Sequence, residues 1–165
     1  MAEAADLVRA AQRGDALALG ELMELLVPYV GRICGPIALQ DGPDAVQEAM
    51  IKILRGIGGL RDPAALYGWA RVIAVHEAVR VARQRAGVFP VDLSDLSAPG
   101  DQQLGVDIVD TLTRLTPQHR AVLVLRDIEG LTEEQAGEIL SLPVGTVRSR
   151  LFRARTSFRK AWTHD

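Results

Sequence analysis

Apolar residues recur at helical spacing along most of this chain of 165 residues. They lie three and four positions apart, which is the period of a helix with one buried face. The sequence has no clear run in which apolar and polar residues alternate, as they do in a half-buried strand. Such a chain builds a core by packing helices on one another, and we therefore predict an all-α protein.

Clusters of glycine, proline and aspartate divide the helical pattern into two small domains. Residues 1–86 are expected to form the first helical bundle, and residues 105–165 the second. Between them, residues 87–104 contain prolines, glycines, serines and aspartates in place of the periodic pattern. This composition is typical of a flexible linker.

The first domain is expected to contain a short helix that stops at Gly14 and three longer helices. In the first of these, Asp15 caps the N-terminus and the Gly35-Pro36 pair ends the helix. The next two run from about residue 44 to 57 and from the Asp62-Pro63 loop to about residue 85. Their inward residues are predicted to be Val46, Met50, Ile53, Leu54 and Ile57, and then Leu66, Trp69, Ile73 and Val79.

The second domain carries clear start and stop signals. Thr116 and Pro117 begin a helix that is expected to end at Gly130. Residues 132–135 fit a capping box, and residues 141–143 interrupt the short helix that it opens. A last helix follows from about residue 144 to 162. Two helices joined by so short a break form a helix-turn-helix, whose second helix enters the major groove of DNA.

The last helix has one apolar face and one face suited to DNA. Val147, Leu151 and Ala154 recur on one side, together with Phe158. The chain has a net charge of −2, yet residues 144–162 contain six basic residues and no acid. Arginine can bind guanine through two hydrogen bonds, serine can bind a base or a phosphate, and a ring can contact a thymine methyl. The predicted DNA-binding residues are Thr146, Arg148, Ser149, Arg150, Phe152, Arg153 and Arg155.

The run LPVGTVRSRL at residues 142–151, followed by Arg153-Ala154-Arg155, resembles region 4 of the sigma-70 family in its extracytoplasmic-function (ECF) group. Residues 115–132 resemble the preceding helices of that region, so the resemblance covers about residues 106–160. It implies that the last helix reads the −35 promoter element. Two residues depart from the family pattern. Ser141 occupies the position of a glycine in the turn, and Gly137 occupies the position of an alanine at a close helix crossing.

Residues 44–54, DAVQEAMIKIL, resemble region 2.2 of the same family. The resemblance implies that this segment binds the β′ clamp of core RNA polymerase, and the family resemblance of the whole chain implies the β flap as a further polymerase contact. Side chains three and four positions apart share one helix surface. The predicted polymerase-binding residues on this surface are Asp44, Gln47, Glu48 and Ile51.

Residues 60–85 resemble regions 2.3 and 2.4, which open promoter DNA and capture the −10 element in that family. Capture of single-stranded DNA needs a basic groove and surfaces on which bases can stack. Trp69 is predicted to be a core anchor rather than a stacking platform. The family usually has asparagine in place of His76 and aspartate in place of Arg80. The candidates for −10 binding are Arg61, Trp69, Arg71, His76, Arg80 and Arg83.

The sequence indicates no enzymatic or metal chemistry. His76-Glu77 begins like a zinc-protease motif, but the second histidine is missing. The single cysteine, Cys34, and three scattered histidines do not form a metal site, and Cys34 is expected to be a small buried apolar residue. We predict no catalytic residue and no cofactor.

The N-terminus lacks a signal-peptide pattern, and no uninterrupted apolar run is long enough to span a membrane. These two features predict a cytoplasmic protein without membrane insertion.

The main hypothesis is therefore an ECF sigma factor that directs RNA polymerase to selected promoters. Its expected partners are core polymerase, promoter DNA and an anti-sigma factor. Two alternatives remain open. The first is a helix-turn-helix regulator that binds duplex DNA without polymerase. The second is a degenerate sigma-like protein that titrates polymerase or an anti-sigma factor, supported by the departures at His76 and Arg80.

Overall fold

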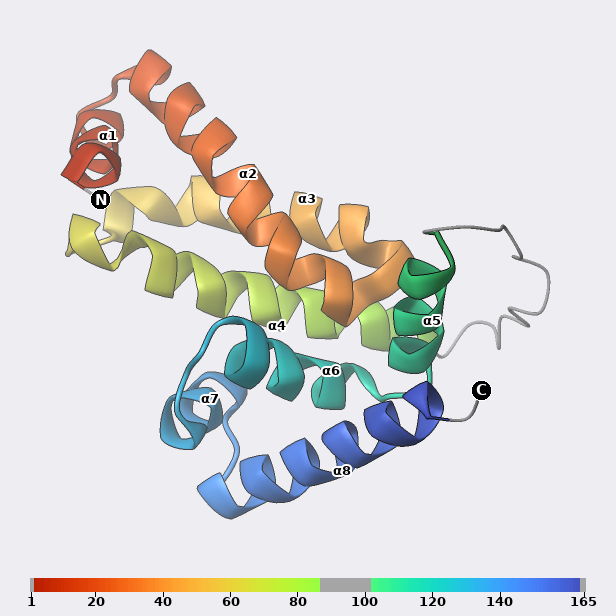
Figure 1. The fold of residues 1–165 in the computed structure, drawn as a ribbon. Helices are drawn as coiled ribbons and strands as arrows, with labels where there is room; N and C mark the ends of the chain where they lie inside the picture. Colours follow the sequence, from red (N-terminus) through yellow and green to blue (C-terminus); the bar gives the residue numbers. More distant parts are fainter. Residues whose placement is uncertain (1, 87–101, 164–165) are drawn as a thin grey trace. The chain divides into compact units, whose positions relative to one another are not determined.

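The computed structural model describes residues 2–86 and 102–163, and its regular elements there are all helical (Figure 1). The prediction of an all-α fold is confirmed. The chain divides into two compact units, Met1–Val81 and Ala82–Asp165. The linker expected at residues 87–104 lies outside the described residues, except for its last three positions at the start of a helix.

The first unit begins with a hairpin of helices α1 (Ala2–Gln12) and α2 (Ala16–Ala38), which pack on each other. Gly14 makes the turn with a φ of +94°, a conformation that glycine adopts without strain. Asp15 caps α2 as predicted, since its side chain accepts hydrogen bonds from the amides of Leu17 and Ala18. The buried side of α2 includes Leu22, Leu26, Tyr29, Val30 and Ile33.

The predicted end of α2 is wrong. The helix continues through Gly35 and Pro36 to Ala38, because Ile37 and Ala38 are buried and anchor the last turn in the core. Gly35 instead allows a close approach: a Cβ atom built on Gly42 would lie 3.4 Å from the Gly35 Cα. Gly35 therefore allows close packing of the backbone, although the sequence pattern had indicated that it ends the helix.

Helix α3 (Gly42–Gly56) packs on α2 and leads through the short 3₁₀ turns η2 (Ile57–Gly59) and η3 (Pro63–Ala65) to α4 (Leu66–Ala86). The predicted inward face of α3 is partly wrong. Ile53 and Ile57 are buried, but Val46 and Met50 are only half-buried, and Leu54 is 46% exposed. The buried face is instead made by Ala45, Ala49 and Ile53.

The inward face predicted for α4 needs a similar correction. Leu66 is buried, whereas Trp69, Ile73 and Val79 are only half-buried. Half of the buried positions of α4 are alanines, and Ala70, Ala74 and Ala78 are all at 0% exposure. Small residues let helix backbones approach closely, so the large side chains at neighbouring positions lie at the edge of the core.

The segment that contains α2 and α3, Ala16–Gly59, is long and apolar enough to cross a membrane by length and composition alone. The core helix of a soluble protein passes the same test. The buried side chains along α2 pack against α1 and α3, which is the environment of a core helix. Packing within the unit thus accounts for the buried apolar side chains of this segment, whereas Leu17, Leu25 and Val27 are exposed.

The second unit contains α5 (Gln102–Thr113), α6 (Pro117–Leu123), a π-helical turn η4 (Val124–Ile128), α7 (Glu133–Leu140) and α8 (Val144–Trp162). Thr116 caps α6 as predicted. The helix expected from Thr116 to Gly130 is found as α6 followed directly by η4, which ends at Ile128 and leaves that side chain 56% exposed. Buried Arg120 donates to the carbonyl oxygens of Leu112 and Leu115 and so satisfies the end of α5.

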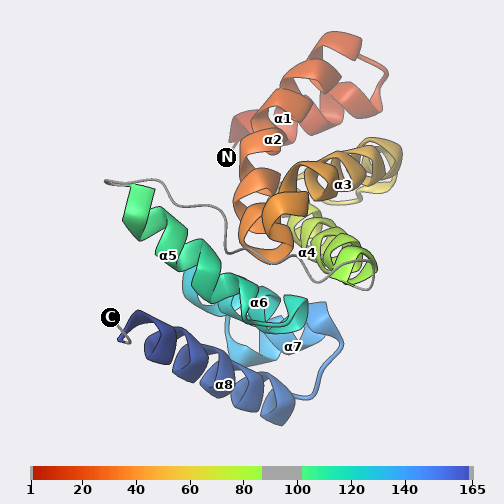
Figure 2. The same cartoon turned by 90° about the vertical axis from the view of Figure 1, so that its right-hand side faces the viewer.

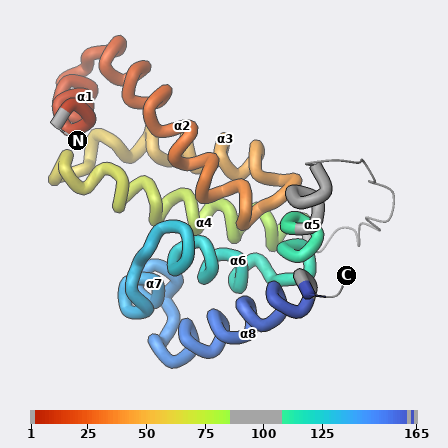
Figure 3. The backbone as a smooth tube through the Cα atoms, in the orientation of Figure 1, coloured from red at the N-terminus to blue at the C-terminus, as the bar shows by residue number. Residues whose placement is uncertain are grey.

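The turn between α7 and α8 follows the sequence prediction closely, and Figure 3 traces its path. Thr132 and Gln135 form the complete capping box at the start of α7. Ser141 ends α7 in the left-handed region, with φ 55° and ψ 45°. A Cβ atom on Gly137 would lie 2.7 Å from the carbonyl oxygen of Leu142, so this glycine permits the tight crossing.

Ser141→Gly is expected to stabilise the second unit by about 1 kcal/mol, because glycine adopts the left-handed region without the Cβ penalty. For a domain of this size, this raises the melting temperature by roughly 4 °C, which a thermal unfolding scan can measure. Gly130, with φ +67°, offers the matched control, and Gly130→Ala should lower stability by a similar amount. An unchanged or lower melting temperature for Ser141→Gly would contradict the strain at this turn.

Candidate nucleic-acid interface

Helix α8 is held against the second unit along one face. Val147, Leu151 and Ala154 are buried, and Phe158 is half-buried, as the spacing predicts. The helix packs on α5, α6 and α7, which lie along its inner side in both views (Figure 2). The orientation of the opposite face is therefore fixed by the core of the unit.

The opposite face of α8 carries the predicted DNA-binding residues. Arg148, Ser149 and Arg153 are exposed, and the ring of Phe152 is 72% exposed, which is unusual for so large an apolar side chain. Arg155 is also exposed, and Thr146 and Arg150 are half-buried. Arg148, Ser149, Phe152 and Arg153 thus lie on the outer side of α8, whereas Arg150 and Arg155 flank the buried stripe and reach toward Gln118 and Asp127.

Three of these arginines are held by side chains from preceding elements. Arg148 donates to Glu133 of α7, with its Nε atom 3.0 Å and its Nη2 atom 2.8 Å from the carboxylate oxygen Oε2. Arg155 forms an ion pair with Asp127 of η4, and Arg150 donates to the side-chain oxygen of Gln118 at 2.7 Å. None of these partners was predicted from the sequence, since they lie 15 to 32 positions away along the chain.

The α8 surface is electropositive enough to affect a neighbouring histidine. The pKa of His119, on α6, is lowered by burial and further by the positive charges of Arg150 and Arg153. The neutral form of this side chain is thereby favoured. Two arginines of α8 therefore lie close enough to this α6 side chain to act on its charge.

The predicted polymerase-binding surface lies on the exposed side of α3. Asp44, Gln47 and Glu48 are all exposed, and Ile51 is 37% exposed. Leu54, one turn further on, adds exposed apolar area next to Ile51. The surface therefore combines acidic and amide groups with an apolar strip, a composition suited to binding another helix.

The candidates for −10 binding are distributed over α4 and the loop before it. Arg61, His76 and Arg83 are exposed, and Arg71 is half-buried. Trp69 is half-buried, and its ring lies so close to Gly56 that a Cβ atom there would be 2.9 Å from the ring. This contact supports the prediction that Trp69 is a packing residue between α3 and α4.

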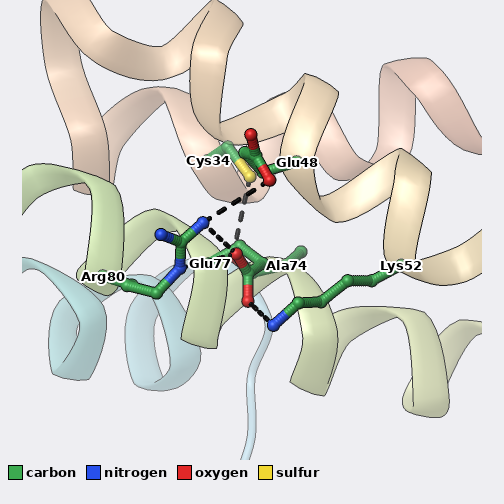
Figure 4. Close-up of polar contacts among 6 residues, drawn as sticks. All are labelled: Cys34, Glu48, Lys52, Ala74, Glu77 and Arg80. Atoms are coloured by element: carbon green, nitrogen blue, oxygen red, sulfur yellow. Dashed lines mark hydrogen bonds and ion pairs between the residues drawn. The ribbon is translucent and has the colours of Figure 1, made fainter.

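Arg80 lies within a network of charges that joins α4 to α3 (Figure 4). Its Nε and Nη2 atoms donate to Glu77 at 2.9 and 2.6 Å, and its Nη2 atom is 3.6 Å from Glu48. Lys52 of α3 forms a further ion pair with Glu77, whose side chain is only 3% exposed. The arginine that departs from the family is thus engaged within the protein.

Glu77 is a buried carboxylate whose charge is retained by its partners. Burial by itself raises the pKa of Glu77, but hydrogen bonds and charges from Lys52 and Arg80 outweigh burial and lower it from 4.5. A lowered pKa in the folded state adds stability that is present above the unfolded value of 4.5 and is lost as the pH falls through the folded pKa.

Glu77→Gln is therefore expected to lower the free energy of unfolding at pH 7 by about 1–3 kcal/mol, because two cations lose a charged acceptor. The difference from the wild type should shrink as the pH falls below 4.5. Urea unfolding followed by circular dichroism at several pH values measures it. Glu48→Gln, at an exposed position on the same network, should change stability by less than about 0.5 kcal/mol. A pH-independent difference would contradict this role of Glu77.

The structure places Cys34 in the core of the first unit, as predicted. The residue is fully buried, and its Sγ atom lies 3.6 Å from the carbonyl oxygen of Ala74 (Figure 4). Burial, with a smaller contribution from the charge of Glu77, raises its pKa to about 12. The thiol therefore stays protonated and unreactive at neutral pH.

Within residues 2–86 and 102–163, no group of histidine, cysteine, aspartate and glutamate side chains could hold a metal ion.

The second unit thus has the features of a helix-turn-helix DNA-binding protein, with a fixed and exposed basic recognition helix. Residues 106–158 match the family described as sigma-70, region 4. The RNA polymerase sigma-H factor of Pseudomonas aeruginosa is 36% identical, over 94% of this chain and 91% of that protein. The ECF RNA polymerase sigma-E factor of Haemophilus influenzae is 34% identical, over 90% of this chain and 89% of that protein.

Solved structures agree on the fold. The structure of CnrH in complex with the cytosolic domain of CnrY matches this chain with a TM-score of 0.68 at 21% identity, and the match covers 99% of each chain. RpoE in complex with the anti-sigma factor NepR from Bartonella quintana has a TM-score of 0.65 at 21% identity, over 88% of this chain and 97% of that one. The chain belongs to the ECF RNA polymerase sigma factors of the sigma-70 family, which are not enzymes.

Proposed function

We propose that this sigma factor reads the −35 element through the exposed face of α8. The observation that carries the proposal is the fixed presentation of Arg148, Ser149, Phe152 and Arg153 on one surface, while the apolar side of the helix is buried. These side chains offer donors for guanine and apolar contact for thymine. Arg150 and Arg155 at the flanks are suited to phosphate contacts, which position a protein without reading sequence.

The first unit binds core polymerase through Asp44, Gln47, Glu48 and Ile51 in this proposal, and approaches the −10 element through α4 and the loop before it. The exposure of the α3 residues supports the first role. For the second, the exposed cations Arg61 and Arg83 are the best-supported residues. Arg80 contributes less, since Glu77 and Glu48 already neutralise its charge.

Run-off transcription with purified core polymerase tests this function. The full-length protein is expected to produce discrete start sites from a genomic promoter library, each preceded by a shared upstream element. The competing function is that of a degenerate sigma-like protein that titrates polymerase, and the engagement of Arg80 within the protein favours it. Tight binding to core polymerase without any specific start site would support this alternative and contradict our proposal.

An anti-sigma factor is the partner that we expect to control this chain in the cytoplasm. The support is that the similar RpoE fold was solved with an anti-sigma factor, and CnrH with a cytosolic domain. Affinity purification of the tagged protein from its native cell, before and after stress, should recover one stoichiometric partner besides polymerase. Recovery of polymerase alone under all conditions would contradict this expectation.

A further inference from the structure

One acidic side chain lies against a DNA-facing arginine of α8 and is more sheltered than the arginine. Glu133 stands at the start of α7, next to the capping box, and its Oε2 atom accepts a hydrogen bond from Nε of Arg148 and lies 2.8 Å from Nη2 of the same ion pair. The Glu133 side chain is 22% exposed, whereas that of Arg148 is 67% exposed. The carboxylate thus holds the arginine from the protein side, and the arginine faces solvent.

The bonding pattern leaves part of the guanidinium available. Arginine carries five N–H donors in a rigid planar fork. The hydrogen bond to Glu133 uses the N–H of Nε, and Nη2 completes the ion pair with the same carboxylate oxygen. In a planar guanidinium the edge formed by Nη1 and Nη2 is distinct from the Nε side that bonds Glu133, and it carries two parallel donors. Such an edge can bind the O6 and N7 atoms of guanine together.

Holding the fork in advance favours base recognition. A free arginine side chain loses rotamer entropy when it binds, and it can reach several neighbouring acceptors equally well. When a second residue fixes the plane of the guanidinium, the side chain has less rotamer freedom to lose on binding. It can then form hydrogen bonds with acceptors in fewer positions. The α7 backbone at Glu133 is itself fixed by the bonds between Thr132 and Gln135.

We infer that Glu133 is a positioning residue that determines sequence specificity, by holding Arg148 in the orientation that reads one base pair of the promoter. This inference rests on the proposed function of α8. It assigns to an acid, which repels DNA phosphates, a favourable part in recognition. Removing Glu133 should then raise affinity for DNA of any sequence but reduce discrimination between sequences.

The chain provides a matched control in Asp127, which forms an ion pair with Arg155. Both acids lie in elements that precede α8, and each replacement by alanine removes one negative charge. Arg155 is proposed to contact phosphate, which carries no sequence information. Asp127→Ala should therefore raise affinity for all sequences alike and leave base preferences unchanged.

The experiment uses the full-length protein, reconstituted with core polymerase, on a promoter library in which the upstream element is randomised. Sequencing of the bound DNA gives the base preference at each position at one fixed salt concentration. Arg148→Ala identifies the positions that Arg148 reads, with an expected loss of preference of roughly fivefold or more. Glu133→Ala should lose preference at those same positions by roughly threefold or more, and Glu133→Gln, which keeps an acceptor, should lose less.

The outcomes separate the inference from the proposed function. If Glu133→Ala leaves every preference unchanged, as Asp127→Ala should, or sharpens the preference at the Arg148 positions, the inference is wrong and the proposed role of α8 stands. If Arg148→Ala changes no position, the proposed role of Arg148 fails and the inference fails with it. Thermal unfolding of each variant shows whether the fold is retained.

Discussion

Arg148→Ala combined with Arg153→Ala is expected to reduce transcription from a −35-dependent promoter by roughly two orders of magnitude. Each bidentate contact between arginine and a base contributes about 1–3 kcal/mol of discrimination, and both side chains are exposed on the outer face of α8. Neither residue is part of the buried core of the second unit, so the fold should be retained. The measurement is the rate of run-off transcript formation by reconstituted polymerase at fixed salt.

The control for this pair is Arg9→Ala combined with Arg13→Ala, at exposed positions at the end of α1. It removes the same charge from the other unit, so it tests whether overall charge accounts for the loss. Transcription by the control variant should stay within about threefold of the wild type, because neither arginine belongs to a surface proposed to bind DNA and exposed charges are screened by salt. An equal loss in both variants would show that α8 has no special part in promoter binding.

Ile51→Asp is expected to weaken binding to core polymerase by roughly 30-fold or more. A charge placed in the apolar strip of an interface removes a buried contact and leaves an unpaired group, which costs about 2 kcal/mol or more at a central position. Ile51 is 37% exposed in the isolated chain, so the substitution should be tolerated by the fold. A competition assay against a labelled sigma factor measures the dissociation constant.

Leu17→Asp is the matched control for the polymerase interface. Leu17 is 81% exposed at the start of α2, and it lies outside the surface proposed to bind polymerase. Its replacement should leave the affinity for core polymerase within about twofold of the wild type, since it removes no predicted contact. Unaltered binding by Ile51→Asp would exclude the α3 surface as the polymerase site.

The recognition helix was the part of the fold that its sequence predicted best. Its bounds, Val144–Trp162, agree with the prediction because residues 141–143 cannot continue α7 and the apolar stripe of α8 has a regular helical period. The buried set of Val147, Leu151 and Ala154 follows from that period alone. A helix with a single apolar stripe and a sharp break before it leaves little choice of orientation.

The core of the first unit was predicted less well, for a physical reason. In α4, Trp69, Ile73 and Val79 were expected to point inward, but they are only half-buried, whereas Ala70, Ala74 and Ala78 are fully buried. A small residue gives a weak signal in a hydropathy pattern, although it decides how closely two helices approach. The end of α2 was also predicted wrongly because packing was not visible in the pattern. Burial of the last turn of α2 outweighs the local tendency of Gly35 and Pro36 to end a helix.

The partners of the charged side chains could not be predicted from spacing. Glu133 and Arg148 come from different helices, and Glu77 joins Lys52 of α3 to Arg80 of α4. Each pair depends on how the helices pack, whereas periodicity reports only which face of a helix is buried. The exposed site residues could therefore be predicted from the pattern of a single helix. The residues that orient them could be identified only from the packed structure.

Directed DNA cleavage tests the central claim most directly. Ser157 is exposed on α8, one turn after Arg153, and Ser157→Cys provides a position for a tethered iron chelate. Cys34 will not compete for the label, because it is buried and its pKa is about 12. In a promoter complex with core polymerase, we expect cuts clustered in one groove at the −35 element. Cleavage no greater than that of the protein with Cys34 alone would contradict the placement of α8 in the DNA.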